Sequence, residues 1–185
     1  LIVDSTEEVL DAPMGDVSFT GRLDMLLRTP TGEAFVLDFK WTGQSKYLRA
    51  DIEEGVALQL ATYAWLLRSR GENGDIHTGY FMLAQGELLS TSGLLGEAAL
   101  HSPLDFQEVW NRGRHSWEED YRMLKSGTLT VRGVTEARIA EREGLKPEKV
   151  REDLKQNASA VGRLYLKPCA FCDFGILCGM KEGAA

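Results

Sequence analysis

Cysteine is scarce in this sequence, and its apolar runs are short. The 185 residues include three cysteines, and all of them lie between Cys169 and Cys178. No apolar run approaches the about 18–20 residues that a membrane-spanning helix needs, and no signal peptide is visible. These absences exclude a membrane-spanning protein. We therefore expect a cytoplasmic protein with no membrane partner.

Basic residues are also in deficit, with 21 Lys and Arg against 28 Asp and Glu and a formal net charge of −7. Nucleic-acid-binding modules are usually basic, because neutralisation of phosphates drives their affinity. The charge argues against an autonomous nucleic-acid binder, unless bound cations or other domains offset it. The chain begins at Leu1 rather than Met, so we expect a fragment of a longer protein.

What the sequence does have is a strand pattern around residues 35–41, Phe-Val-Leu-Asp-Phe-Lys-Trp. Its apolar residues recur with a period of two, which is typical of a strand buried on one face, with Trp41 on the apolar side. Asp38 and Lys40 therefore share the other face. A solvated outer face with an ordinary ion pair is one interpretation, and a reactive site is the other.

A second alternating segment covers residues 17–27 and puts Asp24 on the polar side, opposite Leu23 and Met25. Thr29-Pro30-Thr31-Gly32 predicts a turn, so the two segments should form a hairpin. Asp24 then shares a face with Asp38 and Lys40. Two carboxylates about 5 Å apart repel each other unless a cation lies between them or one of them stays protonated, and a divalent metal ion fits the first need.

The clearest predicted helix covers residues 51–70, with acidic residues in its first turn and Gly71 after its end. Gln59 and Tyr63 lie four residues apart on its apolar stripe. A buried amide left unpaired costs about 1–3 kcal/mol, so Gln59 needs hydrogen-bond partners. Either the backbone satisfies it, or Gln59 and Tyr63 face the carboxylates.

Further elements complete an α+β pattern. We expect strands at residues 1–10, 76–83 and 87–90, a loop at 91–103, and a helix at 104–125 followed by Gly127. The apolar side of that helix should consist of Phe106, Val109, Trp110, Trp117, Tyr121 and Leu124. The charged segment 135–157 predicts a short helix pair or a partly mobile region.

The order of these motifs resembles that of the PD-(D/E)XK nucleases, and more closely that of their RecB-like branch in bacterial helicase–nucleases. The matching residues are Gly21-Arg22-Leu23-Asp24, then Val36-Leu37-Asp38-Phe39-Lys40, then Gln59 and Tyr63. The resemblance implies a restriction-endonuclease-like core with a mixed central sheet flanked by helices. It suggests a nuclease core at residues 1–92, a helical C-terminal extension of the same domain at 93–165, and a cysteine-containing tail at 166–185.

The resemblance also implies the chemistry. The catalytic residues that it suggests are Asp24, Asp38, Lys40, Gln59 and Tyr63. Asp24, Asp38 and the backbone carbonyl of Phe39 would bind Mg²⁺ or Mn²⁺, and Lys40 would orient a water molecule or neutralise developing charge. RecB-like relatives also have a metal-binding histidine before the first motif, whereas the three histidines here, His77, His101 and His115, come after it.

The C-terminal cysteines form a second motif, Cys169-x₂-Cys172-x₅-Cys178. It resembles the cysteine triplet of iron–sulfur-containing AddB-type nuclease subunits, in which a fourth, upstream cysteine completes a [4Fe–4S] cluster. Nothing upstream in this sequence supplies that cysteine, so the cluster is incomplete here. A zinc site with His101 or His115 as the fourth ligand is an alternative, as are three buried, unliganded thiols.

We therefore expect a Mg²⁺- or Mn²⁺-dependent deoxyribonuclease domain, with exonuclease more than endonuclease action, from a larger DNA repair or recombination protein. Its partners would be DNA, single-stranded or at duplex ends, and a helicase subunit or domain. The alternative is a catalytically inactive scaffold of the same fold that binds DNA or a helicase partner. The acidic balance and the missing histidine favour the scaffold, whereas intact Asp24, Asp38 and Lys40 favour the enzyme.

Overall fold

The structure is a computed structural model that describes residues 1–41, 43–96, 98–129 and 132–165, with no side chains described for 132–134. The chain divides into two compact units, Leu1–Asn111 and Arg112–Ala185. The first unit contains a sheet, and the described part of the second is helical. No helix in the described ranges is long and apolar enough to cross a membrane.

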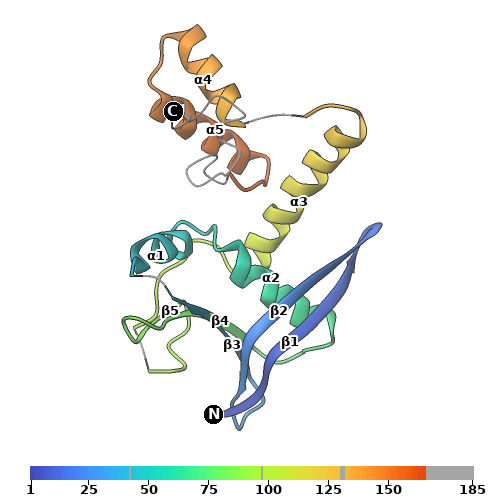
Figure 1. Cartoon of the computed structure of the whole chain (residues 1–185), viewed down its shortest axis with the longest axis vertical. Helices are drawn as coiled ribbons and strands as arrows, with labels where there is room; N and C mark the ends of the chain where they lie inside the picture. Colours follow the sequence, from blue (N-terminus) through green and yellow to red (C-terminus); the bar gives the residue numbers. More distant parts are fainter. Residues whose placement is uncertain (42, 97, 130–131, 166–185) are drawn as a thin grey trace, which may run out of the picture. The chain divides into compact units, whose positions relative to one another are not determined.

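The first unit is built on a five-stranded mixed sheet of order β1-β2-β3-β4-β5 (Figure 1). Its strands are β1 (Ile2–Met14), β2 (Val17–Arg28), β3 (Ala34–Lys40), β4 (Ile76–Met82) and β5 (Glu87–Ser90). Neighbouring strands are antiparallel except β3 and β4, which are parallel. A parallel pair needs a crossover connection, and two helices supply it here. This mixed sheet with flanking helices confirms the predicted α+β, restriction-endonuclease-like class.

The crossover contains two helices, α1 (Ser45–Glu53) and α2 (Leu58–Ser69), so the single helix predicted at residues 51–70 is wrong. Gly55 adopts φ +67 and ends α1. The N–H groups of Gly55 and Val56 bond back to the carbonyls of Ile52 and Asp51, which is a Schellman closure. The acidic residues that we expected at a helix start therefore lie at the end of α1.

The strict alternation expected for residues 17–27 is also wrong at one point. Met25 and Leu27 lie on the sheet face that carries Phe35 and Leu37, as predicted. Leu23, however, packs on the opposite face with Leu26 and α2. The pairing of β1 with β2 skips Asp24 and Glu7, and Glu7 has φ +53. The alternation of β2 therefore breaks at this unpaired position, and Leu23 lies on the face opposite to Met25.

Strand β3, the middle strand of the five, is buried on both faces rather than on one, because other segments cover each face. One face packs against α2, which carries apolar residues on all of its sides. The other packs against Leu88, Leu94 and Leu95. The strand ends at Lys40, and Trp41, predicted to be on the apolar side, is 82% exposed.

The remaining helices are α3 (Phe106–Lys125), α4 (Arg132–Glu143) and α5 (Pro147–Ala160). Helix α3 ends near Gly127, which has φ +80, as predicted. Its expected apolar side is buried only at Val109 and Trp110, while Leu124 is exposed. The segment predicted as a helix pair or mobile region is the helix pair α4 and α5. The three cysteines lie outside the described residues.

Candidate active site

Asp38 is the centre of the candidate site, because it is a carboxylate only 2% exposed in the middle strand of the sheet. Its burial rules out the solvated outer face that the sequence left open. A buried charge needs partners, and Asp38 has three among the predicted residues. Its Oδ1 accepts hydrogen bonds from Gln59 Nε2 at 2.9 Å and from the Tyr63 hydroxyl at 3.0 Å.

Lys40 lies against the other oxygen of Asp38, with its Nζ 2.6 Å from Oδ2. This contact is ionic, since Oδ2 is buried and accepts no well-aligned hydrogen bond within the described part of the chain. Lys40 Nζ also donates to Gln59 Oε1 at 3.0 Å and lies 5.5 Å from the centre of the Tyr80 ring. The ammonium group is therefore held at a defined position while its side chain remains 28% exposed.

Gln59 and Tyr63 come from one face of α2, where residues four apart lie side by side. Gln59 Nε2 donates to the Tyr63 oxygen at 3.0 Å as well as to Asp38. Burial first, and then the negative charge of Asp38, raise the pKa of Tyr63 well above its usual range. The phenol therefore stays protonated and donates to Asp38. Both side chains therefore donate to Asp38, and Gln59 also accepts a hydrogen bond from Lys40.

Asp24 joins the site through the backbone. The ladder between β2 and β3 ends at the pair Met25–Leu37, and Asp24 is the next residue along β2. Its Oδ2 accepts the N–H of Phe39 at 2.7 Å, in place of a strand carbonyl. Asp24, Asp38 and Lys40 thus lie on the side of the sheet that α2 covers, as the hairpin prediction required.

The donor set fits a hard divalent cation. Among the residues described, no group of three or more His, Cys, Asp or Glu side chains converges. Asp24 accepts the backbone N–H of Phe39, the residue that follows Asp38, so one carboxylate is bonded to the chain neighbour of the other and the Phe39 carbonyl lies in the same segment. Mg²⁺ is commonly bound by one or two carboxylates together with water and substrate phosphate oxygens. The buried Oδ2 of Asp38, which has an ionic contact with Lys40 and no hydrogen bond among the described residues, is the acceptor that such a cation would use.

Other acidic and histidine side chains of the first unit and of α3 have other partners. Glu7 forms an exposed ion pair with Arg22 at 3.1 Å. Glu8 bonds to Ser5 and Arg70, and these bonds lower its pKa. His77 lies 3.5 Å from Glu33, and His115 contacts the carbonyl of Gly162.

Sequence reasoning missed Tyr80 at this site and left the role of Gly21 unexplained. Tyr80 pairs with Asp38 across the parallel strands and is buried, so burial raises its pKa further above its usual range. The parallel register would have placed it there, but the alternation of β4 alone does not. Gly21, in the first motif, has room for no side chain, because an added Cβ would lie 2.6 Å from Leu66 Cδ1 of α2.

Comparison with known proteins agrees with this geometry. The family model of the PD-(D/E)XK nuclease superfamily matches residues 3–179. No curated protein matches the chain. One similar solved structure, described as a crystal structure of SSO0001, has a TM-score of 0.33 and 17% sequence identity, with 65% of this chain and 50% of that chain covered. This chain thus spans half of that chain's length. Because the family model covers nearly the whole sequence, the chain belongs to the PD-(D/E)XK nuclease superfamily.

Proposed function

We propose that this chain is a metal-dependent nuclease domain that hydrolyses phosphodiester bonds in DNA. The observation that carries the proposal is Asp38, a buried carboxylate with one oxygen lacking a hydrogen bond, beside Asp24 and Lys40. A buried carboxylate paired with a lysine in this way is poorly explained by stability alone, because replacing a buried ion pair with apolar residues is often stabilising.

Asp24, Asp38 and the carbonyl of Phe39 would hold one or two Mg²⁺ or Mn²⁺ ions. When bound, the metal supplies Lewis-acid activation of water and neutralisation of phosphate charge. Lys40 would hold the attacking water or stabilise the negative charge that develops on phosphorus-bound oxygens. Its position for that role is set by Gln59 and Asp38, which contact its Nζ at 3.0 and 2.6 Å.

Gln59 and Tyr63 would act chiefly on Asp38. By donating to Oδ1 they fix the rotamer of the carboxylate and leave Oδ2 for the cation. Tyr63 stays a donor well into the alkaline range because burial and the charge of Asp38 raise its pKa. Pre-positioning of this kind avoids reorganisation of the site during the reaction.

We further propose that the chain works within a larger DNA repair or recombination protein of the RecB-like, AddB-type kind, alongside a helicase. The net charge of −7 supports this, since other domains would supply part of the grip on DNA. The spacing of Cys169, Cys172 and Cys178 suggests three thiolate ligands of an iron–sulfur cluster. The 185-residue chain alone should then bind little iron, and an extension with an upstream cysteine should bind more.

The test is cleavage of end-labelled single-stranded DNA with Mn²⁺ or Mg²⁺, with circular single-stranded DNA as a second substrate. We expect degradation of the linear strand and slower loss of the circle, as for an exonuclease. EDTA should stop both reactions. Cleavage that persists in EDTA would contradict the mechanism.

Metal binding can be measured without turnover. A cation that binds only the folded chain raises the unfolding temperature as its concentration increases. Mn²⁺ should do so for the native chain and not for Asp38→Asn.

The alternative is a catalytically inactive scaffold. It is suggested by the lack of a third converging carboxylate in the described ranges. Such a scaffold would bind DNA without cleaving it.

A further inference from the structure

Trp41 is unusual because it exposes 82% of its surface directly after the lysine of the candidate site. Its backbone is held in place, since the carbonyl of Lys40 accepts the N–H of Leu83 at 3.1 Å. Trp41 therefore stands where the parallel strands β3 and β4 both end. Tryptophan is highly buried on average, and an exposed one on a fixed backbone indicates a contact with a partner.

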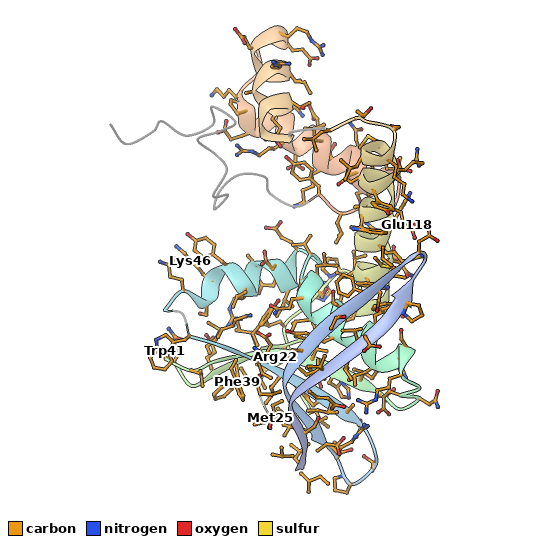
Figure 2. All side chains as sticks on the ribbon, turned by 45° about the vertical axis from the view of Figure 1, so that its right-hand side comes forward. Arg22, Met25, Phe39, Trp41, Lys46 and Glu118 are labelled. Atoms are coloured by element: carbon orange, nitrogen blue, oxygen red, sulfur yellow. The ribbon has the colours of Figure 1, made fainter. Side chains whose placement is uncertain are left out.

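The first turn of α1 adds an aromatic ring and a cation. Tyr47 is half exposed, and Lys46 Nζ lies 4.9 Å from the centre of its ring. Figure 2 shows Trp41 at the end of β3 and Lys46 at the start of α1, toward the same edge of the first unit. The two segments are joined by a few residues only.

The charge of this segment is opposite to that of the chain. Residues 40–50 contain three basic residues, Lys40, Lys46 and Arg49, and no acidic residue, whereas the chain carries −7. Arg49 is paired with Glu87 at 2.7 Å, whereas Lys46 lies over the ring of Tyr47. A local cationic, aromatic segment in an acidic protein suits an anionic partner with flat, apolar faces.

We propose that Trp41, Lys46 and Tyr47 form a platform that binds unpaired nucleotides next to the candidate active site. This inference rests on the proposed nuclease function and specifies its substrate as a single strand or an unwound end. Aromatic rings stack on bases of any sequence, and a lysine contacts the phosphates between them. Bases inside a duplex are already stacked and offer no free face.

The spacing along β3 agrees with this assignment. Three residues of extended strand span about 10 Å, which separates the backbone of Trp41 from that of Asp38. A phosphodiester at the carboxylates and a base on Trp41 would therefore belong to nearby nucleotides of one strand. The platform would hold the strand on one side of the bond to be cleaved, and so orient it.

The test measures binding in the absence of cleavage. A fluorescent single-stranded oligonucleotide of about 12 nucleotides, within the size that such sites cover, is titrated with the 185-residue chain in EDTA, and anisotropy is followed. Trp41→Ala should weaken binding by about five- to a hundredfold. Trp41→Phe should retain most of the affinity. Trp117→Ala is the matched control, because it removes a partly exposed tryptophan from α3, and it should bind like the native chain.

An abasic oligonucleotide of the same length separates stacking from charge. The native chain and Trp41→Ala should bind it equally, because it keeps the phosphates and lacks the bases. Lys46→Gln should weaken binding of both oligonucleotides and reduce the slope of log affinity against log salt by about 0.7. Equal binding of the base-containing strand by the native chain and Trp41→Ala would overturn the inference, and would indicate that Trp41 meets a protein surface instead.

Binding and cleavage can fail independently. If Trp41→Ala binds weakly but no variant cleaves with Mn²⁺, the platform stands and the nuclease proposal fails. If the native chain cleaves and Trp41→Ala cleaves with the same KM, the nuclease proposal stands and the platform fails. A blunt duplex of equal length should bind more weakly than the single strand, and equal affinity would also count against the platform.

Discussion

Two buried carboxylates in this molecule have similar surroundings and differ in one respect. Asp38 in β3 is 2% exposed and Glu136 in α4 is 3% exposed, and each lies beside a cation and a tyrosine hydroxyl. Both oxygens of Glu136 are hydrogen-bonded, Oε2 to Arg151 at 3.0 Å and Oε1 to Tyr165. In Asp38, by contrast, both aligned donors go to Oδ1, and Oδ2 has only the ionic contact with Lys40.

The difference separates a structural pair from a site that can accept a ligand. Glu136 uses its acceptors within its own unit, where it ties α4 to α5 and to the segment after α5. Asp38 has a second carboxylate, Asp24, on the neighbouring strand, so its charge is locally in excess. Burial and a tyrosine partner are therefore insufficient to identify a reactive carboxylate, and an unsatisfied oxygen beside a like charge is the better criterion.

The largest expected effect is on cleavage by Asp38→Asn. Asparagine keeps the size of the side chain and an oxygen for Gln59 and Tyr63, but removes the charge that a cation needs. We expect the cleavage rate to fall at least about a hundredfold. The unfolding temperature should change by less than about 4 °C, because repulsion from Asp24 disappears as the pairing with Lys40 is lost. Cleavage by Asp38→Asn at the native rate would show that Asp38 is not part of the active site.

The corresponding amide substitution at Glu136 should lower stability and leave cleavage unchanged, the reverse of the effect at Asp38. Glu136→Gln leaves Arg151 without its partner, and the free energy of unfolding should fall by about 1–3 kcal/mol, less than for a fully buried pair because Arg151 is 47% exposed. Cleavage should be unchanged. Urea unfolding measures the first result and the labelled-strand assay the second. A large loss of cleavage with native stability would show that the two carboxylates were assigned the wrong roles.

The tyrosines that bond to the two carboxylates, Tyr63 and Tyr165, should differ in their effect on cleavage, and the expected effect is smaller. Tyr63→Phe removes one of the two donors to Asp38 Oδ1, and we expect about a tenfold loss of kcat with little change in KM. Tyr165→Phe removes the donor to Glu136 and should leave kcat unchanged. If both variants lose activity equally, the effect comes from general destabilisation.

The smallest effect is a pH dependence at the alkaline end. The pKa of Tyr63 is raised on folding, so its contribution to stability is fully present below the unfolded value of about 10 and is lost as pH rises above it. Urea midpoints measured between about pH 9 and 11 should therefore decline. The decline should be shallower in Tyr63→Phe and not vanish, because Tyr80 is shifted in the same direction. An identical decline in both proteins would contradict the Tyr63 assignment.

The residues of the candidate site could be predicted because they lie on regular elements with known periods. Asp38 and Lys40 share a strand face, and Gln59 and Tyr63 share a helix face, whatever the surrounding details. The alternation of β2 predicted the correct side for Asp24, although it is interrupted at the unpaired Glu7 and Asp24, so that Leu23 packs on that side too. A backbone with positive φ at a glutamate leaves no trace in hydrophobic periodicity.

Other features depend on tertiary context that the sequence does not display. The apolar stripe continues through Ile52, Val56 and Gln59 with helical spacing, which hid the end of α1 at Gly55. Trp41 was placed with Phe39 because the alternation continued, but pairing stops one residue earlier. The roles of the site residues, the domain borders and the cysteine ligands stay predictions.

The break at Gly55 separates two helices that we expect to open at different rates. Helix α1 has nine residues, too few to persist alone in water, and is fixed by burial of Ile52 and by the ion pair of Arg49 with Glu87. Helix α2 is buried along much of its length. Because a closed Schellman turn separates them, α1 can open without unwinding α2. Amide hydrogens of α1 should therefore exchange with solvent faster than those of α2, which carries Gln59 and Tyr63.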